Sequence, residues 1–133
     1  MIPPITGLYI GLSALLMLTL AALVVRQRLA HNVFLGDGDG AVEPLRRAGR
    51  AFGNTAEYIP ILLLLLAAIE SAGAPAWVAH LFGAAIVISR LGLAVALSSG
   101  NGRLRQISML TTFVILAFGG LGVIGHSMIG GGG

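Results

Sequence analysis

The sequence predicts an all-α integral membrane protein, a bundle of four transmembrane helices, and three observations support this prediction. The chain has 56% hydrophobic and only 10% charged residues, whereas about 25% charged residues is usual for soluble domains. Its mean hydropathy is +0.95. Four long apolar stretches separate the charged segments, and at about 1.5 Å per residue each stretch can cross a hydrocarbon core of about 30 Å.

The predicted spans form one membrane domain over residues 1–133. They cover about residues 7–28, 44–70, 76–97 and 105–128. The first is uncharged from Gly7 to Val25 and lacks the basic start of a secretory signal, so we expect it to stay in the membrane. The turn at 71–76 is short and uncharged, which makes the second and third spans antiparallel neighbours.

The arginines predict the orientation in the membrane. Seven of the eight lie in the segments 26–50 and 98–105, and none lies in the 71–76 turn or at the termini. Because positively charged loops stay in the cytoplasm, we expect both segments there and both termini outside. Arginines that flank apolar spans face membrane lipid, so we expect no nucleic-acid partner. Cysteine is absent, which excludes a cysteine metal site, and we expect no metal.

The second span opens with polar residues where an apolar helix should begin. Arg50, Asn54, Glu57 and Tyr58 precede Pro60 and a run of leucines, and their spacing places them on one helical face. Ionisable groups at membrane depth cost several kcal/mol unless they are paired or serve a purpose. This face is therefore the candidate functional site.

Glu57 has two candidate partners. If the turn between the second and third spans is centred near Gly73, Glu57 and Arg90 each lie about 20 Å along their helices from it. The two side chains are then level, and a structural ion pair between them would fix the packing of the two helices. The alternative partner is the ammonium group of a bound ligand.

The arginines near the first and last loops gather at the same membrane face as the polar opening. Counting residues from the loop between the first two spans places Arg26 and Arg28 at the same depth as the start of span two, and Arg105 lies at this face after the other loop. Guanidinium groups bind carboxylates well, while a carboxylate, an amide and a phenol bind an ammonium and neutral groups. Such a site suits a small zwitterion with extra carboxylates, and a γ-glutamyl tripeptide fits this description.

The motif Arg50-x-x-x-Asn54-x-x-Glu57-Tyr58-x-Pro60 resembles the signature of the MAPEG family, the membrane-associated proteins in eicosanoid and glutathione metabolism. The resemblance extends over nearly the whole chain and is closest to bacterial members. It implies a homotrimer in the bacterial inner membrane, with glutathione bound between neighbouring subunits near the cytoplasmic side. The implied cofactor is glutathione, as a co-substrate.

The resemblance also assigns roles to individual residues. It implies that glutathione is bound by Arg50, Asn54, Glu57 and Tyr58, with Arg26 or Arg28 as a further contact. Arg105 matches the arginine that stabilises the glutathione thiolate, and it is the candidate catalytic residue. A nearby guanidinium favours the charged form of a thiol, so this role is physically sound.

Three hypotheses for function follow. The first is a glutathione transferase or peroxidase that directs the thiolate at a small lipophilic electrophile from the bilayer. The second is a small proton-coupled multidrug exporter, which would use a single glutamate in the membrane. The third is a structural or ligand-sensing trimer that binds glutathione without catalysis, because Gly92, Leu93 and Leu97 stand where many family members carry histidine or aromatic residues.

Overall fold

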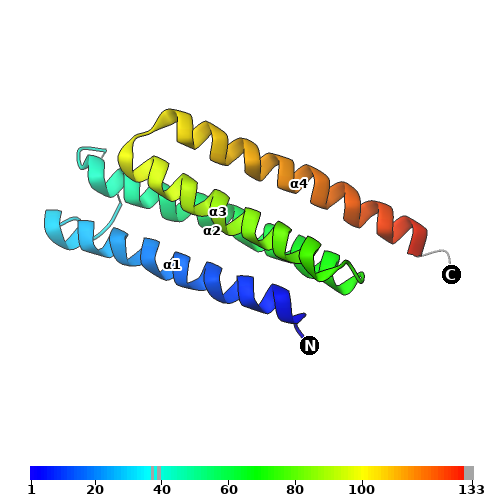
Figure 1. The fold of residues 1–133 in the computed structure, drawn as a ribbon. Helices are drawn as coiled ribbons and strands as arrows, with labels where there is room; N and C mark the ends of the chain where they lie inside the picture. Colours follow the sequence, from blue (N-terminus) through cyan, green and yellow to red (C-terminus); the bar gives the residue numbers. More distant parts are fainter. Residues whose placement is uncertain (37, 39, 131–133) are drawn as a thin grey trace.

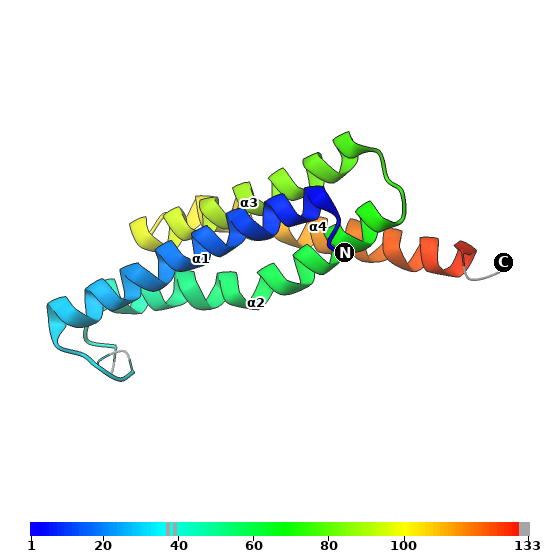
Figure 2. The ribbon, with the colours of Figure 1, turned by 90° about the horizontal axis from the view of Figure 1, so that it is seen from below.

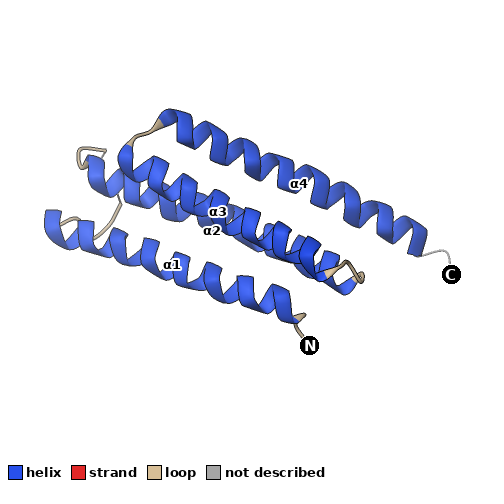
Figure 3. Ribbon diagram, in the orientation of Figure 1, coloured by secondary structure: helices blue, strands red, loops and turns tan. Residues whose placement is uncertain are grey.

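The protein is all-helical in a computed structural model, which describes residues 1–130 except 37 and 39. The helices are α1 (Pro4–His31), α2 (Glu43–Ser71), α3 (Ala76–Ser99) and α4 (Gly102–Gly130), and only short links join them (Figure 3). Each helix is long and apolar enough to cross a membrane. The predicted all-α architecture with four spans is confirmed.

The helices α2 and α3 form a central antiparallel hairpin, and the other two helices flank it (Figures 1 and 2). Helix α1 packs against both members of the hairpin, and so does α4. Within the described part of the chain, α1 and α4 do not touch each other. The hairpin therefore forms the centre of the molecule, and side chains on α2 and α3 are the ones that can reach both flanking helices.

The molecule has two chemically different ends. The links that precede α2 and α4 lie at one end, which we call the arginine end, and both termini lie at the other, which we call the terminal end (Figure 1). The two arginine-rich segments, 26–50 and 98–105, thus meet at the arginine end. Counting residues from the turns between the spans predicts that these two segments lie at the same end.

An apolar core and a close approach of α1 to a glycine of α3 hold the helices together. Between the hairpin and α1, Leu62, Leu66 and Ile86 are fully buried in an apolar core. Close to it, the ring of Tyr9 on α1 lies across Gly83 on α3, where an added Cβ would lie 2.3 Å from two ring atoms. Glycine is required at this position, because any larger residue would push α1 away from α3.

Candidate functional site

At the arginine end, the first turns of α2 face the link between α3 and α4 across a hollow of about 180 Å³. The charged residues around it are Glu43, Arg46, Arg47, Arg50 and Arg105. The four from α2 share one helical face because they are three or four residues apart. Four guanidinium groups and one carboxylate give the hollow an excess of positive charge.

Glu43 binds two of these arginines. Its Oε2 lies 2.6 Å from Nη2 of Arg46, and its Oε1 lies 3.0 Å from Nε of Arg47. Among the residues that the structure describes, Arg50 and Arg105 form no salt bridge. Both are exposed. The hollow therefore offers two guanidinium groups, one from α2 and one from α4, to an incoming anion.

Arg105 also lines a second, less polar hollow. This one has a volume of about 420 Å³ and includes Met109 and Phe113 on α4. The Phe113 ring is 6.5 Å from the ring of Tyr58 on α2. Arg105 thus lies between a charged hollow and an apolar one.

Arg90 organises the inner side of this region. It is fully buried on α3, donates a hydrogen bond of 2.9 Å to Oδ1 of Asn54, and donates another to Oγ1 of Thr112 on α4. Its guanidinium carbon lies 5.2 Å from the centre of the Tyr58 ring, within the range of a cation–π interaction. One side chain thereby joins three helices and positions two of the predicted ligand contacts.

The predicted ion pair between Glu57 and Arg90 is not formed within the chain. No salt bridge joins them among the described residues, and Glu57 is exposed. The reason lies in helix geometry: Asn54 and Tyr58 are four residues apart and face α3 together, whereas Glu57 is rotated by about 100° from Tyr58. Arg50 and Glu57 lie at the exposed edge of the shared face, whereas Asn54 and Tyr58 lie at the edge that contacts α3, so Glu57 is free to bind another cation.

The two arginines at the end of α1 behave differently. Arg28 donates hydrogen bonds to the carbonyl oxygens of Val33 and Gly36, at 3.3 and 2.7 Å, and so holds the link after α1. It also lines a broad hollow that reaches Arg50. Arg26 is exposed and lines none of the hollows described here. Of the pair, only Arg28 lies near the predicted site.

The α3 positions Gly92 and Leu93 differ in burial. Leu93 is fully buried, and Gly92 is half-buried beside α4, where an added Cβ would lie 2.6 Å from Oγ of Ser108. A side chain at Gly92 would therefore require the Ser108 hydroxyl to rotate away. In this chain, the contribution of α3 to the site comes from Arg90.

The terminal end holds a polar cluster that the sequence analysis missed. The carboxylate of Glu70 at the end of α2 accepts hydrogen bonds from the backbone N–H groups of Ile5 and Thr6 at 2.9 and 2.6 Å, and from the Thr6 hydroxyl at 2.7 Å. The hydroxyl of Tyr9 donates to the His80 carbonyl oxygen at 3.1 Å. Glu70 thus caps α1, whose own preceding residue offers no side-chain cap. Counting residues from the loop between the first two spans places positions 6 and 70 at the same depth, so the sequence could have predicted this contact.

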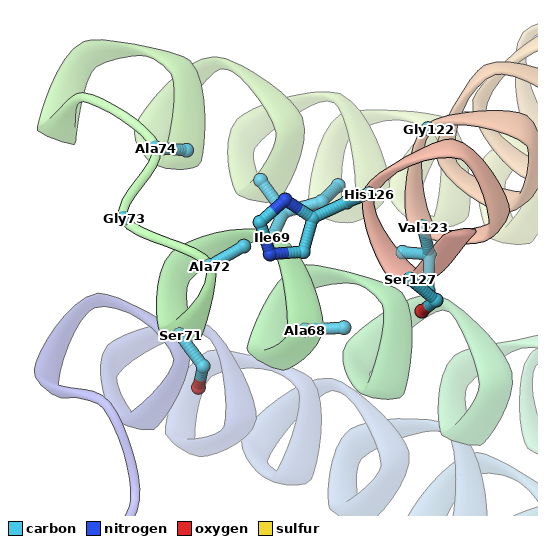
Figure 4. A pocket seen from close by; sticks show the side chains of 10 residues that line it. All are labelled: Ala68, Ile69, Ser71, Ala72, Gly73, Ala74, Gly122, Val123, His126 and Ser127. Atoms are coloured by element: carbon cyan, nitrogen blue, oxygen red, sulfur yellow. The ribbon is translucent and has the colours of Figure 1, made fainter. Parts of the chain in front are cut away.

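A hollow of about 590 Å³ also lies at the terminal end, between the last turns of α2 and α4. Its lining consists mostly of small side chains, and the imidazole of His126 projects into it (Figure 4). His126 is 21 residues after Arg105 on the same helix, a distance of about 30 Å. This hollow is therefore remote from the arginines and from the candidate site.

Comparison with known proteins agrees with the membrane architecture. The chain matches the model of the MAPEG family over residues 6–125. It is 39% identical over 87 residues to the inner membrane protein YecN of Escherichia coli strain K12. The YecN protein of Escherichia coli O6:H1 matches equally well over the same length. Each alignment covers 65% of this chain and 65% of the relative, slightly less than two thirds. No solved structure matches the chain.

Proposed function

The chain belongs to the MAPEG family, and on this basis we propose that it binds glutathione at the arginine end and activates its thiol toward a lipophilic electrophile. Family membership supports a glutathione-related membrane protein. Its four apolar helices and its similarity to an inner membrane protein make it an integral protein of the inner membrane. The arginine end faces the cytoplasm in this proposal, following the charge bias of its loops.

One observation carries the proposal. Arg50 and Arg105, from helices far apart in the sequence, line the same hollow, and neither is held by a carboxylate of the described chain. Two free guanidinium groups suit an anionic ligand: Arg50 can form a pair of parallel hydrogen bonds with a carboxylate, and Arg105 can stabilise a thiolate. Glutathione carries two carboxylates, an ammonium and a thiol. Since both arginines belong to one protomer, the same chain supplies Arg105 to the hollow.

The neighbouring residues match the rest of the ligand. Glu57 is exposed and unpaired among the described residues, so it can hold the ammonium group. Asn54 and Tyr58 are held in place by Arg90 and provide neutral polar contacts. Arg28, beside Arg50 in the broad hollow, is a further contact.

Arg105 has the catalytic role in this scheme. Its positive charge lowers the pKa of a thiol next to it and increases the fraction of thiolate. The thiol loses its proton to solvent, the thiolate sulfur forms a bond to the electrophilic carbon, and the leaving group departs with the electron pair. The apolar hollow with Met109 and Phe113 adjoins Arg105 and suits the lipophilic partner. Binding both reactants in adjacent sites accelerates the reaction by proximity.

The active assembly in this proposal is a homotrimer with glutathione held between protomers. Support comes from Glu57, an acidic group exposed on the outside of an apolar helix, which a neighbouring protomer or a ligand between protomers would cover. Crosslinking in mild detergent should give a trimer. A stable dimer would contradict this part of the proposal.

Glutathione binding and turnover can be measured on the purified protein in detergent. We expect ultraviolet absorbance of the thiolate when millimolar glutathione is added, followed by conjugation of chlorodinitrobenzene with release of chloride. Arg105→Gln should abolish the thiolate signal, because the stabilising charge is gone. Arg103→Gln is the matched control, since Arg103 is exposed on the same helix and lines none of the described hollows. Absence of glutathione binding in the wild type would refute the proposal.

Two observations favour alternatives. Gly92 and Leu93 reduce the contribution of α3, which favours a trimer that binds glutathione without turnover. Thiolate formation without conjugation of any electrophile would support it. The exposed Glu57 favours a proton-coupled exporter, which needs an accessible acid in the membrane. Proton-driven efflux from vesicles that is lost in Glu57→Gln, without glutathione binding, would support the exporter.

A further inference from the structure

Among the residues that the structure describes, Glu43 is the one acidic residue that lines the charged hollow. Both of its carboxylate oxygens are engaged: Oε2 accepts from Nε and Nη2 of Arg46 at 2.9 and 2.6 Å, and Oε1 accepts from Nε of Arg47 at 3.0 Å. All three residues are about 40% exposed at their side chains. The carboxylate therefore acts as an internal anion that a soluble anion would have to displace.

The link between α3 and α4 passes close to Arg47. Gly100, in this link, has φ +76°, and a Cβ added there would lie 3.5 Å from Nη2 of Arg47. Arg47 lines the hollow, but its Nε is bound to Glu43. Among the described residues, Arg50 and Arg105 are the arginines of the hollow that no carboxylate holds.

We propose that Glu43 determines the anion specificity of this hollow, so that it accepts a carboxylate end of a ligand and discriminates against polyanions such as pyrophosphate. The assignment of the ligand rests on the proposed function. The hollow of about 180 Å³ equals the volume of about six water molecules at roughly 30 Å³ each. It has room for one end of a tripeptide, and the remainder lies toward Asn54 and Tyr58.

The physical reason is competition for guanidinium groups. A single carboxylate is satisfied by one or two arginines. Arg50 supplies one without disturbing Glu43, and Arg105 stays available for the thiolate. A compact polyanion gains most of its binding energy from several cations at once. In this hollow it meets the negative charge of Glu43, which also occupies part of the donor groups of Arg46 and Arg47.

Glu43→Gln tests the proposal by isothermal titration of inorganic pyrophosphate into the purified protein in detergent. The substitution frees Arg46 and Arg47 and removes one negative charge. Because repulsion by Glu43 is lost and two guanidinium groups become available, we expect pyrophosphate to bind about tenfold more tightly. Glutathione affinity should change by less than about threefold, since its carboxylates use arginines that Glu43 does not hold.

Two further variants separate specificity from bulk charge. Ala30→Lys adds one positive charge to an exposed position on α1 outside the hollow, and it should change pyrophosphate binding by less than about twofold, because exposed charges are screened by salt. The triple variant E43Q/R46Q/R47Q should return pyrophosphate binding to the wild-type level. Unchanged binding in Glu43→Gln, an equal gain in Ala30→Lys, or a gain that persists in the triple variant would each overturn the proposal.

Arg46→Gln provides a test that does not depend on the folding of Glu43→Gln. With Arg46 held by Glu43 in the wild type, its loss should leave pyrophosphate binding within about threefold, and a tenfold loss would show that Arg46 already binds the polyanion. The pyrophosphate titrations require no glutathione. A wild type that fails to bind glutathione would therefore refute the proposed function, while the comparison of pyrophosphate affinities would still decide the role of Glu43.

Discussion

Two glutamates on α2 have opposite surroundings: Glu70 at the terminal end and Glu57 at the middle of the helix. At the terminal end, Glu70 accepts three hydrogen bonds from the first turn of α1. Nearby, Tyr9 donates to the His80 carbonyl. These polar groups satisfy one another, and the result is a helix cap and a fixed contact between helices.

Toward the arginine end, polar groups exceed the partners that the chain provides for them. Glu57 is exposed without an ion pair, and Arg50 and Arg105 face open hollows, within the described residues. Water and lipid headgroups can solvate Arg50 and Arg105 at the membrane surface, but Glu57, at the middle of α2, is costly there unless a ligand or another subunit binds it. Glu70 is thus satisfied within the chain, whereas Glu57, Arg50 and Arg105 stay available to a ligand.

The largest effect on stability should come from the packing near the terminal end. Gly83→Ala places a methyl group against the Tyr9 ring, and overpacking of this kind lowers the free energy of unfolding by about 1–3 kcal/mol. An unfolding titration in mixed micelles measures this loss. Gly120→Ala is the matched control, because nothing lies within 4 Å of a Cβ added there. Equal stability of the two variants would show that α1 and α3 are not tightly packed.

A smaller loss is expected for the cap on α1. Glu70→Gln removes the negative charge that faces the N-terminus of the helix and one of the two acceptor oxygens, which lowers the free energy of unfolding by about 1–2 kcal/mol. Glutathione affinity should not change, because Glu70 is at the opposite end from the arginines. The same titration, followed by glutathione binding on the folded variant, checks both statements. A loss of binding in a fully stable variant would break the division between the two ends.

Glu57→Gln should leave stability unchanged and weaken glutathione binding, the opposite of Glu70→Gln. This residue is exposed and unpaired in the described chain, so the free energy of unfolding should stay within about 0.5 kcal/mol of the wild type. Glutathione affinity should fall about tenfold, which corresponds to about 1.4 kcal/mol, because the ligand ammonium loses its counter-charge. Calorimetric titration gives the affinity. A destabilised protein with normal affinity would reverse the roles assigned to Glu57 and Glu70.

The smallest effect should distinguish the two arginines of α1. Arg28→Gln removes two hydrogen bonds to the following link and should lower the free energy of unfolding by about 1 kcal/mol, with a modest loss of glutathione affinity. Arg26→Gln should have no measurable effect on either quantity, since Arg26 is exposed and borders no described hollow. Equal effects of the two substitutions would remove the distinction between them.

The sequence predicts the fold well because hydrophobic length and loop charge are sufficient for it. Four long apolar stretches and a short turn at 71–76 predict four spans and antiparallel neighbours. The same arithmetic places the arginine-rich segments together at one end. Counting residues from a turn predicts how far along a helix a side chain lies and not the direction in which it points. It therefore placed Glu57 at the same depth as Arg90 but could not show that Glu57 faces outward.

By itself, the sequence determined the membrane class, the four helices and the residues that carry charge at the arginine end, because burying bare charge in lipid is costly enough to dictate where arginines lie. The tertiary structure decided how those charges are distributed. Arg90 forms hydrogen bonds with Asn54 and Thr112, and Glu43 forms salt bridges with Arg46 and Arg47. Arg50 and Arg105 form no salt bridge among the described residues. The physical reason is that hydrogen bonds and ion pairs depend on rotation and distances of a few ångströms, which only the packed helices define.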